Sequence, residues 1–284
     1  MDSIKYLDIP YSDFTICISC NDSIIVELMR ISFFPYLTSE YRYNRPLISI
    51  NIAYYDNVLK IYNKNNNKCF DYKSKSIDVL LNIIFRFIKN MLSPQSGYNL
   101  YHGASFTINE KSVMLLGNSG CGKTTLLTYL LWKRYAYYIS EDIIIFNYLK
   151  NSIVSYPRPL HLRQSSYDFL SKKYIVDYNN FFGFDSVYYN DYLKRYIFTP
   201  KDIKIFDNLP VDYIFCLDIS HEENKIEKII SPFDIVLQNC LLPKNLMSNI
   251  KSTSLMVQNN NIYKLKTNDL RELSEFLVEF VNKK

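Results

Sequence analysis

A glycine-rich segment that ends in Lys and Thr carries the clearest chemistry in this sequence. Residues 117–124 read Gly-Asn-Ser-Gly-Cys-Gly-Lys-Thr, which fits the phosphate-binding loop spacing G-x-x-x-x-G-K-[ST]. Glycines let the backbone turn tightly and bring its N–H groups close to phosphate oxygens. A helix that begins behind the loop points its positive dipole end at the same anion. The sequence therefore predicts a nucleoside triphosphate site.

Two side chains of this loop have specific expected roles. Lys123 would reach the β- and γ-phosphates of the nucleotide, and the hydroxyl of Thr124 would bind Mg²⁺. Cys121 stands close to Lys123 and to a helix N-terminus, surroundings that can lower a thiol pKa, but a small space-filling residue is the preferred interpretation. We expect the nucleotide to contact the whole run of Gly117, Asn118, Ser119, Gly120, Cys121, Gly122, Lys123, Thr124 and Thr125.

A pair of acidic residues follows the loop in the sequence. Glu141 and Asp142 stand between two apolar runs, residues 135–139 and 143–146, that predict buried strands. A charged pair in such a place needs a cation or access to solvent. The pair therefore either faces the phosphates or forms a solvent-exposed turn, in which adjacent carboxylates are common.

Two arginines lie in and after a proline-rich segment. Arg158 stands between Pro157 and Pro159, and each proline biases the residue before it to an extended conformation, so the segment does not begin as a helix. Arg158 and Arg163 could stabilise charge on a transferring phosphoryl group, as arginines do in such sites. We expect one of the two to be only structural.

A third acidic residue leaves other functions open. Residues 213–218 read Tyr-Ile-Phe-Cys-Leu-Asp, an apolar strand that ends in Asp218, as in the Walker B form. No Glu follows Asp218, and the sequence contains no Ser-Gly-Gly motif. The loop could therefore belong to a group-transfer enzyme, to a P-loop ATPase or nucleotide-dependent switch, or to a nucleotide-binding module without turnover.

Apolar runs and helical periodicity predict the elements that position these residues in an α/β domain. Strand 113–116 would feed the loop, and helix 125–132 would follow it. Residues 165–208, dense in Tyr and Phe, predict a partly helical excursion or lid. The remaining predicted elements are strands at 101–108 and 211–217, a helix that begins within 231–240, a hairpin of 255–257 with 262–265, and a terminal helix at 268–281.

The residues before position 98 predict a separate α+β platform. Residues 47–54 and 58–62 predict a hairpin, and residues 76–91 have the apolar spacing of a helix. Residues 93–97, Ser-Pro-Gln-Ser-Gly, break this pattern. We therefore predict two domains, an N-terminal platform at 1–97 and a P-loop domain with a C-terminal hairpin and helix at 98–284.

Composition limits the partners and the location. The net charge of +5 includes no run of Lys and Arg that would predict a nucleic-acid partner. The N-terminus lacks the pattern of a secretory signal, and the most apolar segment, residues 77–92, is charged and too short to span a bilayer, so we expect a cytoplasmic protein without a membrane partner. Cys17 and Cys20 form one C-x-x-C without further ligands nearby, which favours strand residues over a zinc site.

Several of these motifs together resemble a known family. His102-Gly103 on a predicted strand, the loop about fifteen residues later and the triplet Ser140-Glu141-Asp142 are similar to the kinase domain of HPr kinase/phosphorylase. Shorter HPr-kinase-related proteins, which carry a Pro-Arg-Pro segment like residues 157–159, are more similar still; the match covers residues 101–220. The resemblance implies a mixed-sheet P-loop fold of the phosphoenolpyruvate-carboxykinase-like type. It also implies that ATP with Mg²⁺ donates its γ-phosphoryl to a hydroxyl, in the first place serine, of a peptide, protein or small molecule.

The resemblance also implies roles for single residues. Glu141 would be the general base and Asp142 would hold Mg²⁺ directly or through water, although the two roles could be exchanged. His102 would lie near the phosphate; the alternative is an ordinary polar residue at a strand start. The family usually has Asp where Glu141 stands, and HPr kinase itself has a later Glu-x-Arg-Gly signature that this sequence lacks. Family members often assemble, which implies a possible homo-oligomer.

Overall fold

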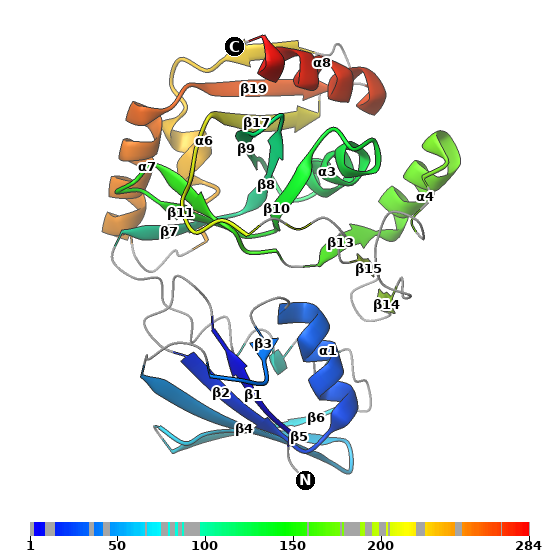
Figure 1. Ribbon diagram of the computed structural model, residues 1–284, viewed down its shortest axis with the longest axis vertical. Coiled ribbons are helices and arrows are strands. Elements are labelled where there is room, and N and C mark those ends of the chain that lie inside the picture. Colours follow the sequence, from blue (N-terminus) through cyan, green and yellow to red (C-terminus); the bar gives the residue numbers. More distant parts are fainter. Residues whose placement is uncertain are drawn as a thin grey trace. The chain divides into compact units, whose positions relative to one another are not determined.

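The computed structural model (Figure 1) consists of two compact units. The first unit comprises Met1–Gln95 with Tyr189–Arg195, and the second comprises Ser96–Tyr188 with Tyr196–Lys284. The structure describes residues 3–8, 15–33, 37–41, 46–65, 67–74, 79, 83–84, 87, 97–157, 159–176, 178, 188–190, 195–198, 203, 205–219, 225–241, 246–267 and 269–283. Both units combine helices with mixed sheets, so the predicted α/β class is confirmed.

The first unit contains a six-stranded sheet and the helix α1 (Ser23–Phe33), which lies between β2 and β3 in the chain. Its strand order is β3-β1-β2-β4-β5-β6. The strands are β1 (Ser3–Leu7), β2 (Thr15–Cys20), β3 (Leu37–Thr38), β4 (Leu47–Tyr55), β5 (Val58–Asn63) and β6 (Lys68–Lys73). Cys17 and Cys20 lie in β2, so the prediction that they are strand residues is confirmed.

The predicted hairpin of the first unit is confirmed. Strands β4 and β5 pair antiparallel, and the turn between them holds Asp56 and Asn57 at φ 49° and 64°. Asp and Asn tolerate this left-handed conformation better than most residues, which explains a tight turn without glycine. The predicted helix at 76–91 lies mostly outside the described residues; its described positions Val79, Ile83, Ile84 and Phe87 are helical.

The second unit contains a six-stranded central sheet in the order β10-β8-β9-β17-β19-β18. Its strands are β8 (Gly103–Ile108), β9 (Lys111–Leu116), β10 (Tyr137–Glu141), β17 (Tyr213–Ile219), β18 (Lys225–Lys228) and β19 (Ile262–Thr267). Strand β17 runs parallel to both β9 and β19, whereas the other neighbours are antiparallel. Strand β9 leads directly into the glycine-rich loop, so the loop lies at the carboxyl edge of the parallel strands.

Two smaller sheets are formed by strands between residues 98 and 210. One has the order β16-β12-β11-β7, with β7 (Tyr98–Tyr101), β11 (Ile144–Asn147), β12 (Ser152–Val154) and β16 (Leu209–Pro210). The other has the order β13-β15-β14, with β13 (Leu160–Arg163), β14 (Tyr188–Asn190) and β15 (Arg195–Phe198). Within the predicted excursion at 165–208, the structure describes these last two strands and the helix α4 (Gln164–Tyr174); much of the remainder lies outside the described residues.

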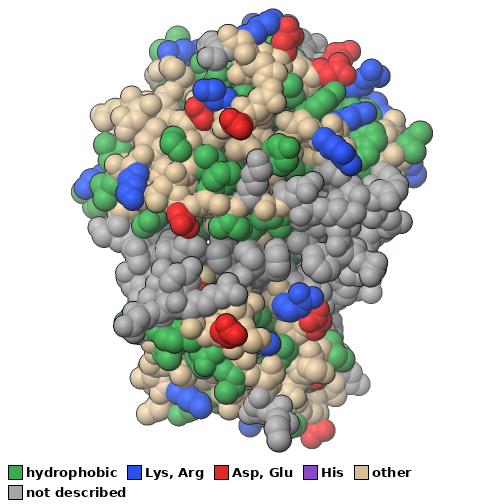
Figure 2. Space-filling model, viewed as in Figure 1, with side chains coloured by type: hydrophobic (Ala, Val, Ile, Leu, Met, Phe, Trp, Pro, Cys, Tyr) green, Lys and Arg blue, Asp and Glu red, His purple; other side chains and the backbone are tan. Residues whose placement is uncertain are grey.

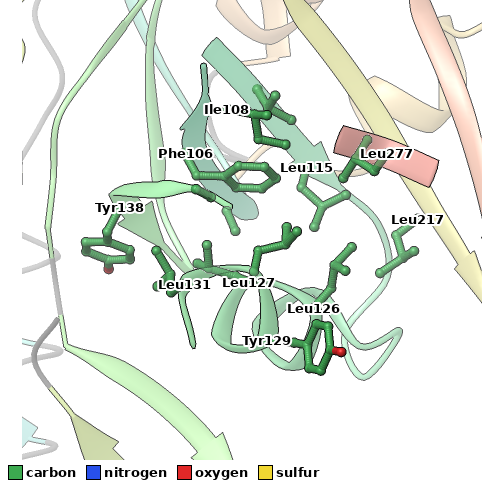
Figure 3. Packing of buried hydrophobic residues seen from close by; sticks show 14 of the residues in the cluster. Phe106, Ile108, Leu115, Leu126, Leu127, Tyr129, Leu131, Tyr138, Leu217 and Leu277 are labelled. Carbon is green, nitrogen blue, oxygen red and sulfur yellow. The ribbon is translucent and has the colours of Figure 1, made fainter. Parts of the chain in front are cut away.

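Two apolar cores cover the two faces of the central sheet. On one face, Phe106 and Leu115 of the sheet point toward Leu126 and Leu127 of α3 (Lys123–Trp132), as Figure 3 shows. The terminal helix α8 (Leu270–Asn282) joins this core through Leu277. The other face packs against the sheet β16-β12-β11-β7 and against α6 (Phe233–Leu237) and α7 (Leu246–Asn259) (Figure 1). Burial on both faces explains why the central strands read as continuous apolar runs.

The predicted strand at 101–108 is in fact two strands in different sheets. Strand β7 belongs to the sheet β16-β12-β11-β7 and β8 to the central sheet, and His102 lies at the bend between the two strands. The residues on both sides of His102 are buried, so the apolar pattern continues through the bend and gave no sign of a break.

The predicted hairpin of 255–257 with 262–265 is wrong. Residues 255–257 belong to the helix α7, and β19 pairs with β17 and β18 instead. The face of α7 that packs inward is largely polar. The hydroxyls of Ser252 and Thr253 lie 2.8 and 3.3 Å from the Tyr101 hydroxyl, and Asn249 accepts a hydrogen bond from Asn99 at 3.1 Å. A buried polar face has no apolar periodicity, so the sequence did not reveal this helix.

The terminal helix α8 is confirmed, and Asp269 caps its first turn. The Asp269 carboxyl accepts hydrogen bonds from the backbone N–H groups of Arg271 and Glu272 and from Lys173 Nζ at 2.8 Å. The bond from Lys173 is the main cause that lowers the pKa of Asp269. This stabilisation is present above the unfolded carboxyl pKa of about 4 and is lost as the pH falls through the lower folded-state pKa.

Asp269→Ala is expected to lower the free energy of unfolding by about 1 kcal/mol at neutral pH, because the helix loses its cap. Asp269→Asn keeps an acceptor oxygen and should cost only about 0.5 kcal/mol. Urea denaturation, followed by fluorescence of the single Trp132, measures both values. The deficit of Asp269→Ala should shrink near pH 3; a deficit independent of pH, or equal in both variants, would contradict the capping role.

Charged side chains of both signs are interspersed on the surface shown in Figure 2. Ion pairs around β18 and β19 include Lys264–Asp218 at 2.6 Å and Lys266–Glu227 at 3.4 Å. None of the helices in the described ranges combines the length and the apolar character that crossing a bilayer requires.

Candidate functional site

The candidate site lies where two strand connections pass side by side from one sheet to another. The chain moves from β7 to β8 at His102 and from β10 to β11 at Asp142. Register places these connections together, because Tyr101 pairs with Ile144 on one side and Ala104 pairs with Glu141 on the other. Residues that stand 40 positions apart in the sequence therefore meet beside the end of β9.

The glycines of the loop take backbone conformations that other residues rarely adopt. Gly117, Gly120 and Gly122 have φ values of 146°, 88° and 88°. A Cβ atom on Gly117 would also come within 2.8 Å of Cys121 Sγ and 2.9 Å of the Leu217 carbonyl oxygen. Gly122, the residue before α3, has no side chain that could cap the helix N-terminus and compete there with an anion.

Lys123 folds over its own loop. Its ammonium donates hydrogen bonds to the carbonyl oxygens of Gly117 at 2.6 Å and Asn118 at 3.0 Å, and only 7% of the residue is exposed. Burial lowers the pKa of Lys123, while neighbouring groups, the carboxyls of Glu141 and Asp142 among them, act in the opposite direction. An anion in the loop would offset the cost of burying this cation.

Thr124 and Glu141 are directly hydrogen-bonded. The Thr124 hydroxyl donates to Glu141 Oε1 at 2.7 Å, and Glu141 is 6% exposed at the end of β10. The residue that the loop pattern assigns to Mg²⁺ thus contacts the first residue of the acidic pair.

Asp142 occupies a strained turn beside His102. Its φ is 66°, and the Ile143 N–H donates to the Glu141 carbonyl oxygen at 2.8 Å, which closes the turn around Asp142. Asp142 Oδ1 lies 3.7 Å from His102 Nε2, and both side chains are partly exposed. Non-glycine residues in this conformation are uncommon and concentrate at functional sites. The Asp142 carboxyl thus lies beside His102, whereas the Glu141 carboxyl is bonded to Thr124.

Arg163 lies next to the loop, at the start of α4. Its guanidinium nitrogen Nη1 is 3.4 Å from the position that a Cβ atom on Gly120 would occupy. The Thr125 hydroxyl donates to Ser166 Oγ at 3.0 Å and so joins the first turns of α3 and α4. Arg158, the other predicted arginine, lies outside the described residues.

Asn239 belongs to the site although no sequence pattern predicted it. It follows α6, is 5% exposed and accepts hydrogen bonds from two backbone groups. Its carbonyl oxygen binds the His102 N–H at 2.7 Å, and its side-chain oxygen Oδ1 binds the Gly117 N–H at 3.2 Å. A single asparagine in a segment of mixed polarity belongs to no periodic pattern or motif, so the sequence contains no signal that indicates its role.

The side chains of Asp218 and Cys121 have contacts that do not favour a role in the site. The Asp218 carboxyl pairs with Lys264 Nζ at 2.6 Å, whereas the Thr124 hydroxyl bonds to Glu141. Cys121 packs partly buried against the core. Burial raises the pKa of its thiol, and Lys123 opposes this only in part, so a space-filling role fits better than a reactive thiol.

Neither a protein-family model nor a curated protein sequence matches the chain. Among solved structures, the chain is similar to the Hpr(Ser) kinase/phosphatase from Coxiella burnetii, with 11% identity and a TM-score of 0.32. That similarity covers 65% of this chain and 94% of the other. The mixed α/β fold rests on the strands and helices described above.

Proposed function

We propose that this protein transfers the γ-phosphoryl group of ATP to a hydroxyl group, with Mg²⁺ as cofactor. The observation that carries the proposal is the hydrogen bond between Thr124 and Glu141, because it joins the phosphate loop to the acidic pair. Phosphoryl transfer requires a positioned nucleotide, a metal and a group that orients the nucleophile more than it requires covalent chemistry. The acceptor hydroxyl belongs to a peptide, protein or small molecule, with serine as the first candidate.

Thr124 and Glu141 fit Mg²⁺ in the proposed site. Mg²⁺ takes hard oxygen ligands and, in phosphate sites, is held by one or two protein oxygens together with water and phosphate. P-loop proteins hold this ion with the Ser or Thr hydroxyl of the loop and a carboxylate. Here the Thr124 hydroxyl is bonded to the nearly buried carboxyl of Glu141. When bound, Mg²⁺ would neutralise charge on the phosphates. The geometry therefore favours Glu141, rather than Asp142, as the residue on the metal side.

Asp142 then takes the role of general base. The acceptor oxygen forms a bond to the γ-phosphorus, the bond from that phosphorus to the bridging oxygen breaks, and the acceptor proton passes to the Asp142 carboxyl as ADP leaves. His102 lies beside this carboxyl and would orient it. Lys123 and Arg163 would supply positive charge along the phosphates.

The ATPase alternative requires Asp218 at the metal. Its ion pair with Lys264, and the bond of Thr124 to Glu141, favour the kinase proposal over this alternative. Kinase and ATPase differ in products, because a kinase that is given its acceptor forms ADP without free phosphate.

The proposal is tested by measuring ADP and inorganic phosphate separately. The full chain is incubated with Mg²⁺ and ATP in the presence of serine-containing peptides or small hydroxyl compounds. ADP in excess of free phosphate, with labelled γ-phosphate on one acceptor, is the expected result. Equal amounts of ADP and phosphate with every acceptor would favour the ATPase, and binding without turnover would favour a nucleotide-binding module.

Glu141→Gln is expected to weaken the effect of Mg²⁺ on ATP affinity by about 10–100-fold, since the amide cannot replace the carboxylate at the metal. Titration calorimetry with and without Mg²⁺ measures this effect. Glu110→Gln is a matched control, because Glu110 lies exposed in the turn at the opposite end of β9. An unchanged Mg²⁺ effect in Glu141→Gln would remove Glu141 from the metal side.

A further inference from the structure

One buried asparagine outside the loop joins the two halves of the candidate site. Asn239 lies between the His102 bend and the first glycine of the loop, and it holds a backbone N–H of each. The two bonds use different oxygens of the same residue, so a displacement of Asn239 would move both parts together.

A third hydrogen bond fixes the orientation of the Asn239 side chain. Its amide nitrogen Nδ2 donates to the Ile235 carbonyl oxygen at 2.7 Å, one turn back in α6. This bond leaves Oδ1 directed at the Gly117 N–H. The side chain thus links the end of α6 to the first residue of the loop through two hydrogen bonds.

The contact with Gly117 matters because this residue sets the path of the whole loop. Gly117 has a φ of 146°, and a Cβ atom there would clash with Cys121 and with the Leu217 carbonyl oxygen. Its carbonyl oxygen also accepts the shorter of the two carbonyl hydrogen bonds from Lys123. The peptide groups on both sides of Gly117 are therefore tied, one to Asn239 and one to Lys123.

We infer that Asn239 is a positioning residue that holds the phosphate loop in its anion-binding conformation before the nucleotide arrives. The inference rests on the proposed nucleotide site for its functional consequence, but not for its structural one. A pre-formed loop binds its ligand more tightly, because less conformational freedom is lost on binding. Without the Asn239 side chain, the Gly117 N–H loses its acceptor and the start of the loop is free to move.

Two substitutions separate this role from simple capping of α6. Asn239→Ala removes both side-chain bonds, whereas Asn239→Asp keeps an acceptor for Gly117 and replaces the donor to Ile235 with a second carboxyl oxygen. Amide hydrogen exchange of the full chain, read at Gly117 by NMR, is the first measurement. Exchange at Gly117 should be about ten-fold faster in Asn239→Ala, the factor expected for one hydrogen bond, and near the wild-type rate in Asn239→Asp.

A matched control exists at the end of α7. Asn260 likewise donates to a carbonyl oxygen one turn back, that of Met256 at 2.8 Å, and bonds to Asn151 in another turn. Asn260→Ala should reduce stability without changing exchange at Gly117. Calorimetric affinity for Mg²⁺-ATP, the second measurement, should fall about ten-fold in Asn239→Ala and stay unchanged in Asn260→Ala.

Each outcome decides a different point. Wild-type exchange at Gly117 in Asn239→Ala, or equally fast exchange in Asn239→Ala and Asn239→Asp, would overturn the positioning role. Faster exchange with unchanged ATP affinity would also overturn the positioning role, because the Asn239 side chain would then not affect binding. If the wild-type chain binds no ATP, the proposed function fails, and the exchange rates still decide whether Asn239 holds the loop.

Discussion

Asp142→Asn is expected to slow phosphoryl transfer by about 10²–10⁴-fold, the range for loss of a general base. Asparagine cannot accept the acceptor proton, but it tolerates the φ of 66° at this position as well as aspartate does, so the turn should keep its shape. ATP affinity should change little, since Thr124 and Glu141 are the proposed metal ligands. Initial rates of transfer, together with calorimetric ATP affinity, measure the two effects separately.

Asp56→Asn provides the control for this substitution. Asp56 occupies an exposed hairpin turn of the first unit at φ 49° and should tolerate asparagine without loss of activity. Transfer at the wild-type rate by Asp142→Asn would show that another group takes the proton. A large loss of ATP affinity in Asp142→Asn would place this residue on the metal side and return the base role to Glu141.

Lys123→Met is expected to reduce transfer by about 10²–10³-fold and to weaken ATP binding, because the phosphates lose a charged donor. Methionine has a similar length and tolerates the buried position, so the fold should survive. The carbonyl oxygens of Gly117 and Asn118 also lose their shared donor, which should loosen the loop itself. Transfer rate, ATP affinity and the urea midpoint distinguish loss of function from unfolding.

Lys150→Met removes an exposed lysine from the turn after β11 and serves as the control for charge. It should leave ATP binding and transfer unchanged. Lys123→Met with wild-type affinity would mean that the loop does not hold phosphate, whatever its glycine spacing suggests.

The sequence was sufficient for those parts of the site in which the chain is locally regular. The spacing from Gly117 to Thr124 predicted the loop, apolar runs and periodicity predicted a strand before it and a helix after it, and the structure contains β9 and α3 at these places. The apolar runs on both sides of Glu141 and Asp142 likewise predicted β10 and β11. Loop spacing and buried strands depend on neighbours in the chain, so a single sequence reveals them.

Features that depend on tertiary contacts were not predictable in this way. The bend at His102 interrupts no apolar run, and α7 buries hydroxyl and amide groups in place of an apolar stripe. The link from Asn239 to Gly117 joins residues 122 positions apart. The proposed choice between Glu141 and Asp142 rests on a contact of the same kind, the hydrogen bond from Thr124 to Glu141, 17 positions apart.

Titration calorimetry of the full chain with ATP, in the presence and absence of Mg²⁺, tests most directly whether residues 117–124 hold a triphosphate beside the acidic pair. Saturable binding that Mg²⁺ strengthens, and that Lys123→Met weakens, is the expected result. Absence of binding by the folded wild-type chain under both conditions would contradict the nucleotide site and every role derived from it.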